Sequence, residues 1–359
     1  MIRVYQKYLA QLFLKKLFII SGIFLSLTFI LSVFEEISFF KDSEIHWTFP
    51  FFLTILNAPS TLFEIFPFIF LIATQFFFID LIEKNELEFL KIHGLNNIKI
   101  LKIISITSFI IGFLLVTIFY YFSSQLKFIY LDLKNDHAKD DKYLAVVTEN
   151  GLWIKDEING YKYIINAKKI ENNFLKNVSI AEFSKNFKLI RVIESLNIDI
   201  SSFNWIVYHP SIFTDNLTND IDENLIIETH FDQEKITSMF RNLSSLSIFE
   251  LKKLENDYKN LGYDTSHIDS HLNRVYSLPI YVSIMSLLSA ILMLNIKRNK
   301  PIIYHIILGV LSSVIIYYFY YLFSVMGQNG KMPILTSIWL PLFILMIFVS
   351  IGLVRVNEK

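Results

Sequence analysis

The chain contains no cysteine and carries no net charge, since its 33 basic side chains balance 33 acidic ones. The first absence excludes disulfide bonds, thiol catalysis and cysteine metal sites. The second argues against a nucleic-acid-binding protein, because such proteins concentrate basic residues on one surface. What the chain has in excess is apolar side chains, which make up 53% of its 359 residues.

A nucleotide-binding loop is also lacking. The segment MGQNGKMP contains Gly327, Gly330 and Lys331, but a Walker A loop has four residues between its glycines and Ser or Thr after the lysine. Here two residues intervene and Met332 follows. We interpret the segment as an exposed turn, so the sequence supports no nucleotide hydrolysis by this chain.

Catalytic and metal-binding groupings are equally hard to find. His267 and His271 are four positions apart and could share a helix face, as metal ligands do, but no third ligand stands nearby. A solvated or interfacial pair is the better interpretation. No Ser-His-Asp grouping is evident. We therefore predict no catalytic residue, metal or cofactor, and the chain is not expected to be an enzyme by itself.

The apolar residues gather in six long blocks. A helix needs about 20 residues to cross the hydrocarbon core of a membrane, and the blocks have this scale. We predict six transmembrane α-helices, three before and three after a long polar insert. The blocks are Leu17 to Phe34, Leu62 to Ile79, Ile103 to Leu126, Val275 to Ile296, Ile302 to Gly330 and Met332 to Val354.

Glu64 interrupts the second block. A carboxylate in the middle of a transmembrane helix costs about 3 kcal/mol on insertion scales, so such acids tend to be functional or paired. Pro59 and Pro67 flank it, however, and residues 49–58 are also apolar. We favour a helix that starts late, which would leave Glu64 near the outer surface, over a functional acid.

Basic residues predict the orientation of the helices. Thirteen Lys and Arg lie in segments 1–16, 83–102, 297–300 and the C-terminal tail, whereas the opposite short loops hold only Lys41 and Lys331. Short cytoplasmic loops are enriched in Lys and Arg. Both termini and the segment 83–102 are therefore predicted to be cytoplasmic, and the long insert is predicted to lie outside.

The insert differs in kind from the helices. Short alternating runs replace the long blocks, as in Leu196, Ile198 and Ile200, which alternate with polar residues. Several short strands without intervening helices predict an antiparallel β-sandwich or jelly roll. After it, Ser247 and Glu250 have the spacing of a capping box that begins a helix. The helix is expected to end at Gly262. The predicted parts are helices one to three in 1–126, the jelly roll in 127–246, a helical connector in 247–274 and helices four to six in 275–359.

A short charged segment, EKNELEFLKIHGLNN at residues 83–97, separates the second and third blocks. Asn85 and Glu88 have the spacing of a capping box, and Gly94 stands where a left-handed residue would end a helix. We predict a short cytoplasmic helix with two alternative roles. It is either a surface connector in the membrane interface or a docking helix whose apolar side chains enter a groove on a soluble partner.

Four stretches together resemble a known family. In chain order they are NAPSTLFEIFPFIFLIA, NELEFLKIHGL, ENGLWIKD and MGQNGKMPILTSIWLPLFIL. With three helices on each side of a β-domain, they make the chain similar to the lipopolysaccharide export permeases LptF and LptG, the YjgP/YjgQ family, over essentially its whole length. The last two stretches resemble LptG more than LptF, through Gly151, Leu152, Trp153, Gly327, Gly330, Pro333, Trp339, Leu340 and Pro341.

The resemblance implies a permease subunit of an ABC exporter in the bacterial inner membrane. Such a subunit extracts lipopolysaccharide, while a separate LptB ATPase dimer supplies the energy. The segment 83–97 then corresponds to the coupling helix that fits a groove on LptB. The residues that fall on it are Glu86, Leu87, Glu88, Leu90 and Gly94.

The same resemblance implies a heterodimer of LptF-like and LptG-like chains, in which helices one and five form lateral gates to an apolar cavity for lipopolysaccharide. The periplasmic jelly roll would pass the lipid to the jelly rolls of LptC and LptA, along a path that includes Trp153 and Ile165. The gate and cavity residues expected by position are Phe24, Leu27, Leu31, Tyr317, Tyr320 and Tyr321.

The outer end of helix one departs from the family pattern. Relatives often carry basic residues there, which can meet lipid A phosphates, whereas this chain has Glu35 and Glu36 and only Lys41 beyond them. Either the partner subunit or a divalent cation meets the phosphates, or the head group differs, so no phosphate-binding residue is assigned. Two other functions stay open: an LptF-type paralogue of the same complex, and a membrane-anchored receptor or scaffold whose β-domain binds a ligand.

Overall fold

The structure is a computed structural model that forms two compact units. The membrane unit comprises Met1–Tyr130, Leu243–Lys259 and Tyr263–Lys359, and the sheet unit comprises Leu131–Asn242 and Asn260–Gly262. The residues that the structure describes are 4–41, 46–137, 152–158, 160–171, 173–214, 217–220, 223–233, 235–236, 242–260, 263–294 and 302–357.

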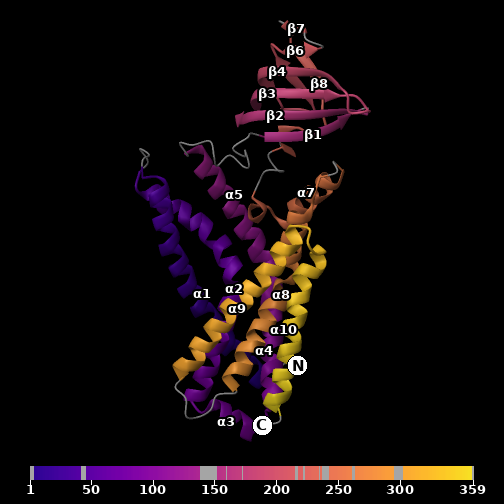
Figure 1. Cartoon of the computed structure of the whole chain (residues 1–359). Helices are drawn as coiled ribbons and strands as arrows, with labels where there is room; N and C mark the ends of the chain where they lie inside the picture. Colours follow the sequence, from indigo (N-terminus) through magenta and orange to yellow (C-terminus); the bar gives the residue numbers. More distant parts are fainter. Residues whose placement is uncertain are drawn as a thin grey trace. The chain divides into compact units, whose positions relative to one another are not determined.

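The membrane unit is built from long apolar helices (Figure 1). Within the described residues six helices are long and apolar enough to cross a membrane, which confirms the six predicted spans. Between them lie a short helix α3 (Glu86–Ile92) and, after the sheet, α7 (Ile248–Asn260). The six spans are α1 (Val4–Phe39), α2 (Thr48–Glu83), α4 (Asn97–Leu114) continued by α5 (Tyr120–Asp136), α8 (Ser266–Leu294), α9 (Ile302–Gln328) and α10 (Ile334–Asn357).

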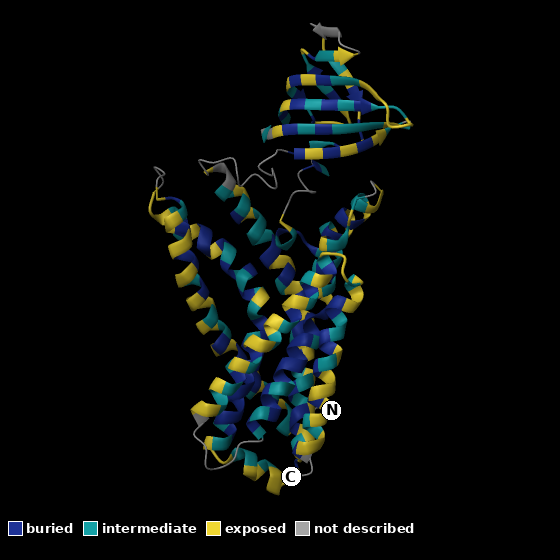
Figure 2. Ribbon diagram, viewed as in Figure 1, coloured by how far each residue is buried: buried dark blue, intermediate teal, exposed yellow. Residues whose placement is uncertain are grey.

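Helices α2 and α8 form the centre of the membrane unit. Their most apolar stretches are 72% and 67% buried, against 17% for α9. Small residues allow close packing around α8: a Cβ added to Gly112 of α4 would lie 2.7 Å from the Pro279 Cα, and Ser108 donates a hydrogen bond to Ser286 at 2.9 Å. The helices α1, α9 and α10 instead leave much of their apolar surface uncovered, as the yellow residues of Figure 2 show.

The third span contains a π turn, Leu115–Phe119, between α4 and α5. A π turn accommodates an extra residue and so rotates the side chains that follow it. Tyr120 comes directly after the turn and is buried. Its hydroxyl donates to the carbonyl of Leu246 at 3.0 Å and lies 2.9 Å from Nε2 of His271. The turn thus directs Tyr120 toward α8 and the segment that leads into α7.

The sheet unit contains one curled antiparallel sheet in the residues that the structure describes (Figure 1). The strand order is β1-β2-β3-β4-β5-β8, with β6 beside β4 and β7 beside β6. An antiparallel, jelly-roll-like domain inserted between the third and fourth spans is therefore confirmed. The strands are β1 (Leu152–Ile158), β2 (Tyr161–Glu171), β3 (Phe174–Phe183), β4 (Leu189–Asp199), β5 (Asn204–Tyr208), β6 (Ser211–Thr214), β7 (Leu217–Asp220) and β8 (Leu225–Glu228).

A row of isoleucines crosses the buried face of the sheet. Ile154 pairs with Ile165, Ile165 pairs with Ile180, and Ile180 pairs with Ile193. All four side chains are buried. Cross-strand pairs of β-branched residues stabilise a sheet because their side chains pack directly against one another. The row gives the inner face of the curled sheet a continuous apolar surface over four strands.

The expected alternation in β4 is wrong at Leu196, which is exposed, whereas Ile198 and Ile200 are buried as predicted. The cause lies on the neighbouring strand. Asn177 of β3 has a φ of 49°, a left-handed conformation that changes which face the following side chains occupy. The change falls between the pairs Lys176–Asn197 and Val178–Ser195, so it affects β4 at Leu196.

The capping box before α7 is confirmed. The Glu250 carboxylate accepts hydrogen bonds from the Ser247 backbone N–H at 2.8 Å and from its hydroxyl at 2.6 Å, and the Glu250 N–H donates back to the Ser247 hydroxyl at 3.3 Å. Gly262, expected to end this helix, and Gly151 of the GLW motif both lie outside the described residues.

Candidate functional site

Helix α3 lies at the end of the membrane unit that also holds both ends of the chain (Figure 1). Tyr8, near the start of α1, donates a hydrogen bond to Oε2 of Glu86 at 2.6 Å. Asn97, at the start of α4, donates to the carbonyl of Val356 in the last turn of α10 at 3.1 Å. The first turns of α1 therefore contact α3, and the last turn of α10 contacts the start of α4, which is the arrangement that a common cytoplasmic side requires.

The C-terminal end of α3 follows the prediction. Gly94 has a φ of 83°, the left-handed conformation that glycine adopts without strain. Its N–H donates to the Lys91 carbonyl at 3.0 Å, and the Leu95 N–H donates to the Leu90 carbonyl, also at 3.0 Å. These two bonds form a Schellman motif, which satisfies the last carbonyls of the helix.

The capping box predicted at Asn85 and Glu88 is wrong. Asn85 is itself left-handed, with φ 59° and ψ 13°, and among the described residues its side chain makes no capping hydrogen bond. An N-cap residue needs extended backbone angles. Asn85 cannot adopt them because it completes the end of α2, where its N–H donates to the Ile82 carbonyl at 3.1 Å. Only Lys84 and Asn85 separate α2 from α3, so the turn that ends α2 also begins α3.

The exposed apolar side chains of α3 are Phe89 and Ile92. They are 60% and 81% exposed, although both are large and apolar. Residues three positions apart lie on the same side of a helix. Each α3 residue is described, and none of them is buried. The face formed by Phe89 and Ile92, here called the α3 apolar face, is therefore available to another molecule.

The sequence-predicted coupling residues lie differently from Phe89 and Ile92. Leu87 and Leu90 are half-buried, Glu88 is exposed, and the half-buried Glu86 is engaged by Tyr8. Leu87 and Leu90 are assigned to the coupling helix by the family resemblance alone. Residue spacing could not have identified the exposed pair, because Leu87 and Leu90 are also three positions apart.

Helix α3 is attached to the two helices that precede it. It follows α2 after two residues, and α2 is held to α1 by an ion pair between Lys16 Nζ and Asp80 Oδ2 at 2.7 Å. Lys84 Nζ lies 3.7 Å from the same oxygen. Helix α3 is therefore connected to α2 by the short turn, and to α1 both by the Tyr8–Glu86 hydrogen bond and, through α2, by Asp80.

The predicted gate residues on α1 line its uncovered side. Leu27 and Leu31 are exposed, and Phe24 is half-buried, with its ring edge-on to Phe68 of α2 at a centroid distance of 5.3 Å. Beside them, α1 and α2 enclose a groove of about 380 Å³. Sequence reasoning did not identify this groove, whose lining is Leu25, Ser26, Phe29, Ile30, Ile55, Ala58 and Pro59.

The predicted gate residues on α9 divide into two groups. Tyr317 and Tyr321 are exposed and stacked on each other, with ring centroids 6.4 Å apart. Tyr320 is buried, stacks on Tyr281 of α8 at 4.9 Å, and its hydroxyl lies 3.2 Å from the Ser277 hydroxyl. Tyr320 thus holds α9 against α8, whereas the other two tyrosines form an open aromatic surface.

The two residues predicted for the jelly-roll path are not brought together. Ile165 is 1% exposed and belongs to the isoleucine row on the inner face. Trp153 is 59% exposed, and its strand neighbours Leu152 and Ile154 are the buried ones. Successive residues of a strand point to opposite faces, so Trp153 lies on the outer face of the sheet.

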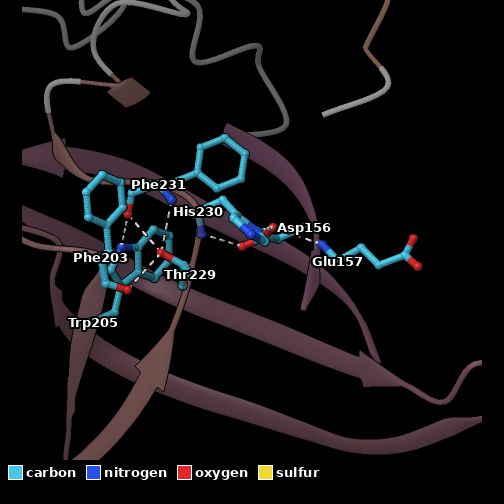
Figure 3. A network of polar contacts seen from close by, with 7 residues as sticks. All are labelled: Asp156, Glu157, Phe203, Trp205, Thr229, His230 and Phe231. Carbon is cyan, nitrogen blue, oxygen red and sulfur yellow. Dashed lines mark hydrogen bonds and ion pairs between the residues drawn. The ribbon is translucent and has the colours of Figure 1, made fainter. Parts of the chain in front are cut away.

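A polar network joins the two ends of the strand order (Figure 3). Asp156 lies on β1, and His230 follows β8. The buried Asp156 carboxylate accepts from the His230 backbone N–H at 3.0 Å and lies 2.8 Å from its Nδ1. Beside it, the Trp205 indole N–H and the Thr229 hydroxyl both donate to the Phe231 carbonyl, at 2.7 and 2.8 Å. The network connects β1 to the segment after β8 and so holds the curl of the sheet.

The histidine pair considered as metal ligands is not a cluster of ligands. His271 contacts Tyr120, and the described residues contain no group of three His, Cys, Asp or Glu side chains that could hold a metal ion.

Comparison with protein families identifies a match over nearly the whole chain. The family model described as lipopolysaccharide export system permease LptF/LptG covers residues 7–355, from the second turn of α1 to the last turns of α10. The chain belongs to this family. Comparison with individual curated proteins gives no match.

Membership of the LptF/LptG family confirms the resemblance that the sequence motifs indicated. The chain is a multi-pass membrane protein and a permease subunit of the lipopolysaccharide export system, so its role is transport. The absence of a nucleotide-binding motif agrees with this role, because a permease subunit does not itself hydrolyse ATP.

Proposed function

We propose that this LptF/LptG permease is the LptG-like subunit of the exporter. It pairs with an LptF-like permease in the bacterial inner membrane, with both termini in the cytoplasm. A separate LptB-like ATPase dimer drives the extraction of lipopolysaccharide, which then passes through the sheet unit toward LptC and LptA. The LptG assignment rests on the GLW motif at 151–153 and on the turn with Gly327, Gly330 and Pro333.

The observation that carries the proposal is the α3 apolar face. Two large apolar side chains stand exposed on a short helix that is fixed to α2 by a turn of only two residues. A chain without a nucleotide-binding motif needs a contact through which an ATPase can act. An exposed helix with apolar side chains three positions apart is suited to a groove on a soluble partner. We assign the contact with the ATPase to Phe89 and Ile92, with Glu88 beside them.

The coupling path follows from the attachments of α3. Closure of the ATPase dimer would displace α3 and with it α2, the most buried helix of the membrane unit. The ion pair between Lys16 and Asp80 would carry the motion to α1. Because α1 bears the gate residues Leu27 and Leu31, the motion changes the width of the lateral gate.

The cargo contacts proposed for the membrane unit are apolar. The groove between α1 and α2 and the uncovered tyrosines of α9 offer surfaces for acyl chains. Burial of each CH₂ group contributes about 0.8 kcal/mol, so a lipid with several acyl chains is held by many small contributions. Beyond the membrane, the isoleucine row that includes Ile165 provides the apolar surface proposed to guide the lipid.

Depletion of the chain from its host tests the transport role. Lipopolysaccharide should accumulate in the inner membrane. In a separate experiment, the complex purified in mild detergent from the undepleted host should retain one soluble ATPase and a second, different permease chain. Normal lipopolysaccharide transport after depletion would contradict the role. Recovery of two copies of this chain, with no other permease, would contradict the heterodimer.

A further inference from the structure

A small cavity lies among the helices of the membrane unit, apart from the groove between α1 and α2. Its volume is about 80 Å³. The side chains around it come from α2, α5, α8, α9 and the segment before α7. They are Ser60, Phe63, Glu64, Pro67, Tyr120, Ser123, Ser244, His271, Arg274, Val275, Leu278, Tyr281 and Tyr320.

Two opposite charges in this lining have no partner in the part of the chain that the structure describes. Neither the Glu64 carboxylate nor the Arg274 guanidinium makes an ion pair or a side-chain hydrogen bond there, although both line the same cavity and both are exposed. Since these two are not paired with each other, they are available to a third group.

Both charges lie at the depth of lipid head groups. Glu64 is 19 residues from the end of α2 at Glu83, and Arg274 is 20 residues from the end of α8 at Leu294. At about 1.5 Å per residue, each lies about 30 Å from the end of its helix nearest α3. The hydrocarbon core of a membrane has about this thickness. The cavity is therefore at the opposite boundary of the core, where the head group of an amphiphile resides.

Two other charged side chains near this boundary, Glu36 and Lys127, already have partners. Glu36 of α1 is buried and accepts a hydrogen bond from the Tyr130 hydroxyl at 2.7 Å. Lys127 of α5 donates to the Asn57 amide oxygen at 2.6 Å. The basic group missing from the outer end of α1 is thus not supplied by Lys127, whereas Arg274 faces the cavity without a partner.

We propose that this cavity binds the head group of the exported amphiphile and prefers one that carries a phosphate and an ammonium group together. The guanidinium of Arg274 can donate two parallel hydrogen bonds to a phosphate, and Glu64 can accept from the ammonium. A head group with only a phosphate would provide no positive charge for Glu64. A neutral head group would provide no opposite charge for either Glu64 or Arg274. The inference rests on the proposed function only in taking the cargo to be an amphiphile.

Native mass spectrometry of the purified complex tests the preference without ATP or transport. The probes are lipid A with and without a phosphoethanolamine substituent, and, as membrane-lipid arms, phosphatidylethanolamine and phosphatidylglycerol. The unmodified complex should retain phosphoethanolamine-bearing lipid A roughly 5- to 10-fold more than plain lipid A, the effect of one typical hydrogen bond. Equal or greater retention of phosphatidylethanolamine would assign the cavity to membrane lipid and overturn the cargo site.

Three variants distinguish the role of Glu64 from the role of Arg274 in binding the head group. Arg274→Gln should lose retention of both forms of lipid A, whereas Glu64→Gln should lose only the preference between them. The exchanged pair Glu64→Arg with Arg274→Glu should stay defective, because the acyl chains fix the direction of the head group. If the exchange restores retention, the two residues pair with each other, and the proposal fails.

Matched controls keep the test independent of folding and of the export role. Glu83→Gln, on the same helix as Glu64, and Arg355→Gln change exposed charges outside the cavity and should leave retention unchanged. All variants should still co-purify with the second permease; its loss from the Glu64 or Arg274 variants would make them interface residues and overturn the proposal. Normal lipopolysaccharide transport after depletion, together with an intact lipid preference, would instead refute only the proposed function.

Discussion

At the scale of single residues, helix α3 shows which structural roles the spacing of residues predicts and which it does not. Gly94 was predictable because a glycine after an apolar helix has one common role, and its left-handed backbone agrees. Asn85 was not, because its conformation is fixed by the end of α2 rather than by the start of α3. The family resemblance likewise does not separate Leu87 and Leu90 from Phe89 and Ile92, since exposure on a short helix is decided by the neighbouring helices.

Phe89→Asp should reduce the amount of ATPase that co-purifies with the complex by roughly tenfold or more, as expected for an apolar anchor at the centre of an interface. The thermal stability of the free permease should barely change, because Phe89 is exposed. Co-purification and a thermal-shift assay measure the two effects.

Lys91→Ser is the matched control for this residue. Lys91 is exposed, and at 100° per residue it lies on the side of α3 away from Phe89. Its substitution should leave ATPase binding intact. Undiminished binding in Phe89→Asp would show that the α3 apolar face does not contact the ATPase.

At the scale of elements, the close approach of α9 to α2 is the contact most relevant to the gate. A Cβ added to Gly309 of α9 would lie 1.9 Å from Nε2 of Gln75 on α2. That Nε2 donates to the His305 carbonyl at 3.0 Å and so holds α9 in place. Gly309 therefore serves the packing of α9, whereas hydropathy alone predicts only that α9 is a transmembrane helix.

Gly309→Ala should displace the Gln75 amide from its hydrogen bond and shift α9, lowering the rate of lipopolysaccharide release from proteoliposomes while ATPase binding is kept. The double variant with Gln75→Ala should be no worse than Gln75→Ala alone, because the obstructing amide is gone; residues in contact are non-additive in this way. Simple addition of the two single effects would argue against this contact.

The network around Asp156 acts on the sheet as an element. Asp156→Ala removes the buried carboxylate that accepts from the His230 backbone N–H and contacts its ring, and a hydrogen bond to a charged group contributes about 1.5–3 kcal/mol. The sheet unit should unfold at a lower temperature and be cleaved faster by protease. Glu157→Ala, at the exposed neighbouring position, should behave like the unmodified chain. Equal protease resistance in the two variants would show that the network does not hold the curl.

At the scale of the whole molecule, the sequence predicts the number of spans and the position of the β-domain better than it predicts the shape of the sheet. Blocks of about 20 apolar residues predict spans because length and hydropathy suffice for them, and the β-domain between Leu126 and Val275 followed from its change of pattern. The curl of the sheet and the exposure of Leu196 were not predictable, because a single left-handed residue, Asn177, changes the faces of two strands.

The absence of cysteine makes the orientation directly measurable, because any cysteine introduced is the only thiol of the chain. A membrane-impermeant maleimide applied to spheroplasts should label Asn186→Cys in the sheet unit and should label Lys91→Cys on α3 only after the membrane is permeabilised. Both side chains are exposed, so accessibility is decided by the compartment. Labelling of Lys91→Cys in intact spheroplasts would place α3 outside the cell and refute the coupling role.

The π turn at Leu115–Phe119 gives the third span two helical halves that are out of phase by one residue. A single deletion there would restore an ordinary helix without shortening the hydrophobic stretch enough to matter. It would also turn the outer half by about 100° and carry the Tyr120 hydroxyl away from Leu246. The rotational phase of this helix, more than its length, therefore sets the contact between Tyr120 and the segment before α7. Natural insertions or deletions in close relatives of this chain should avoid the five positions of the turn.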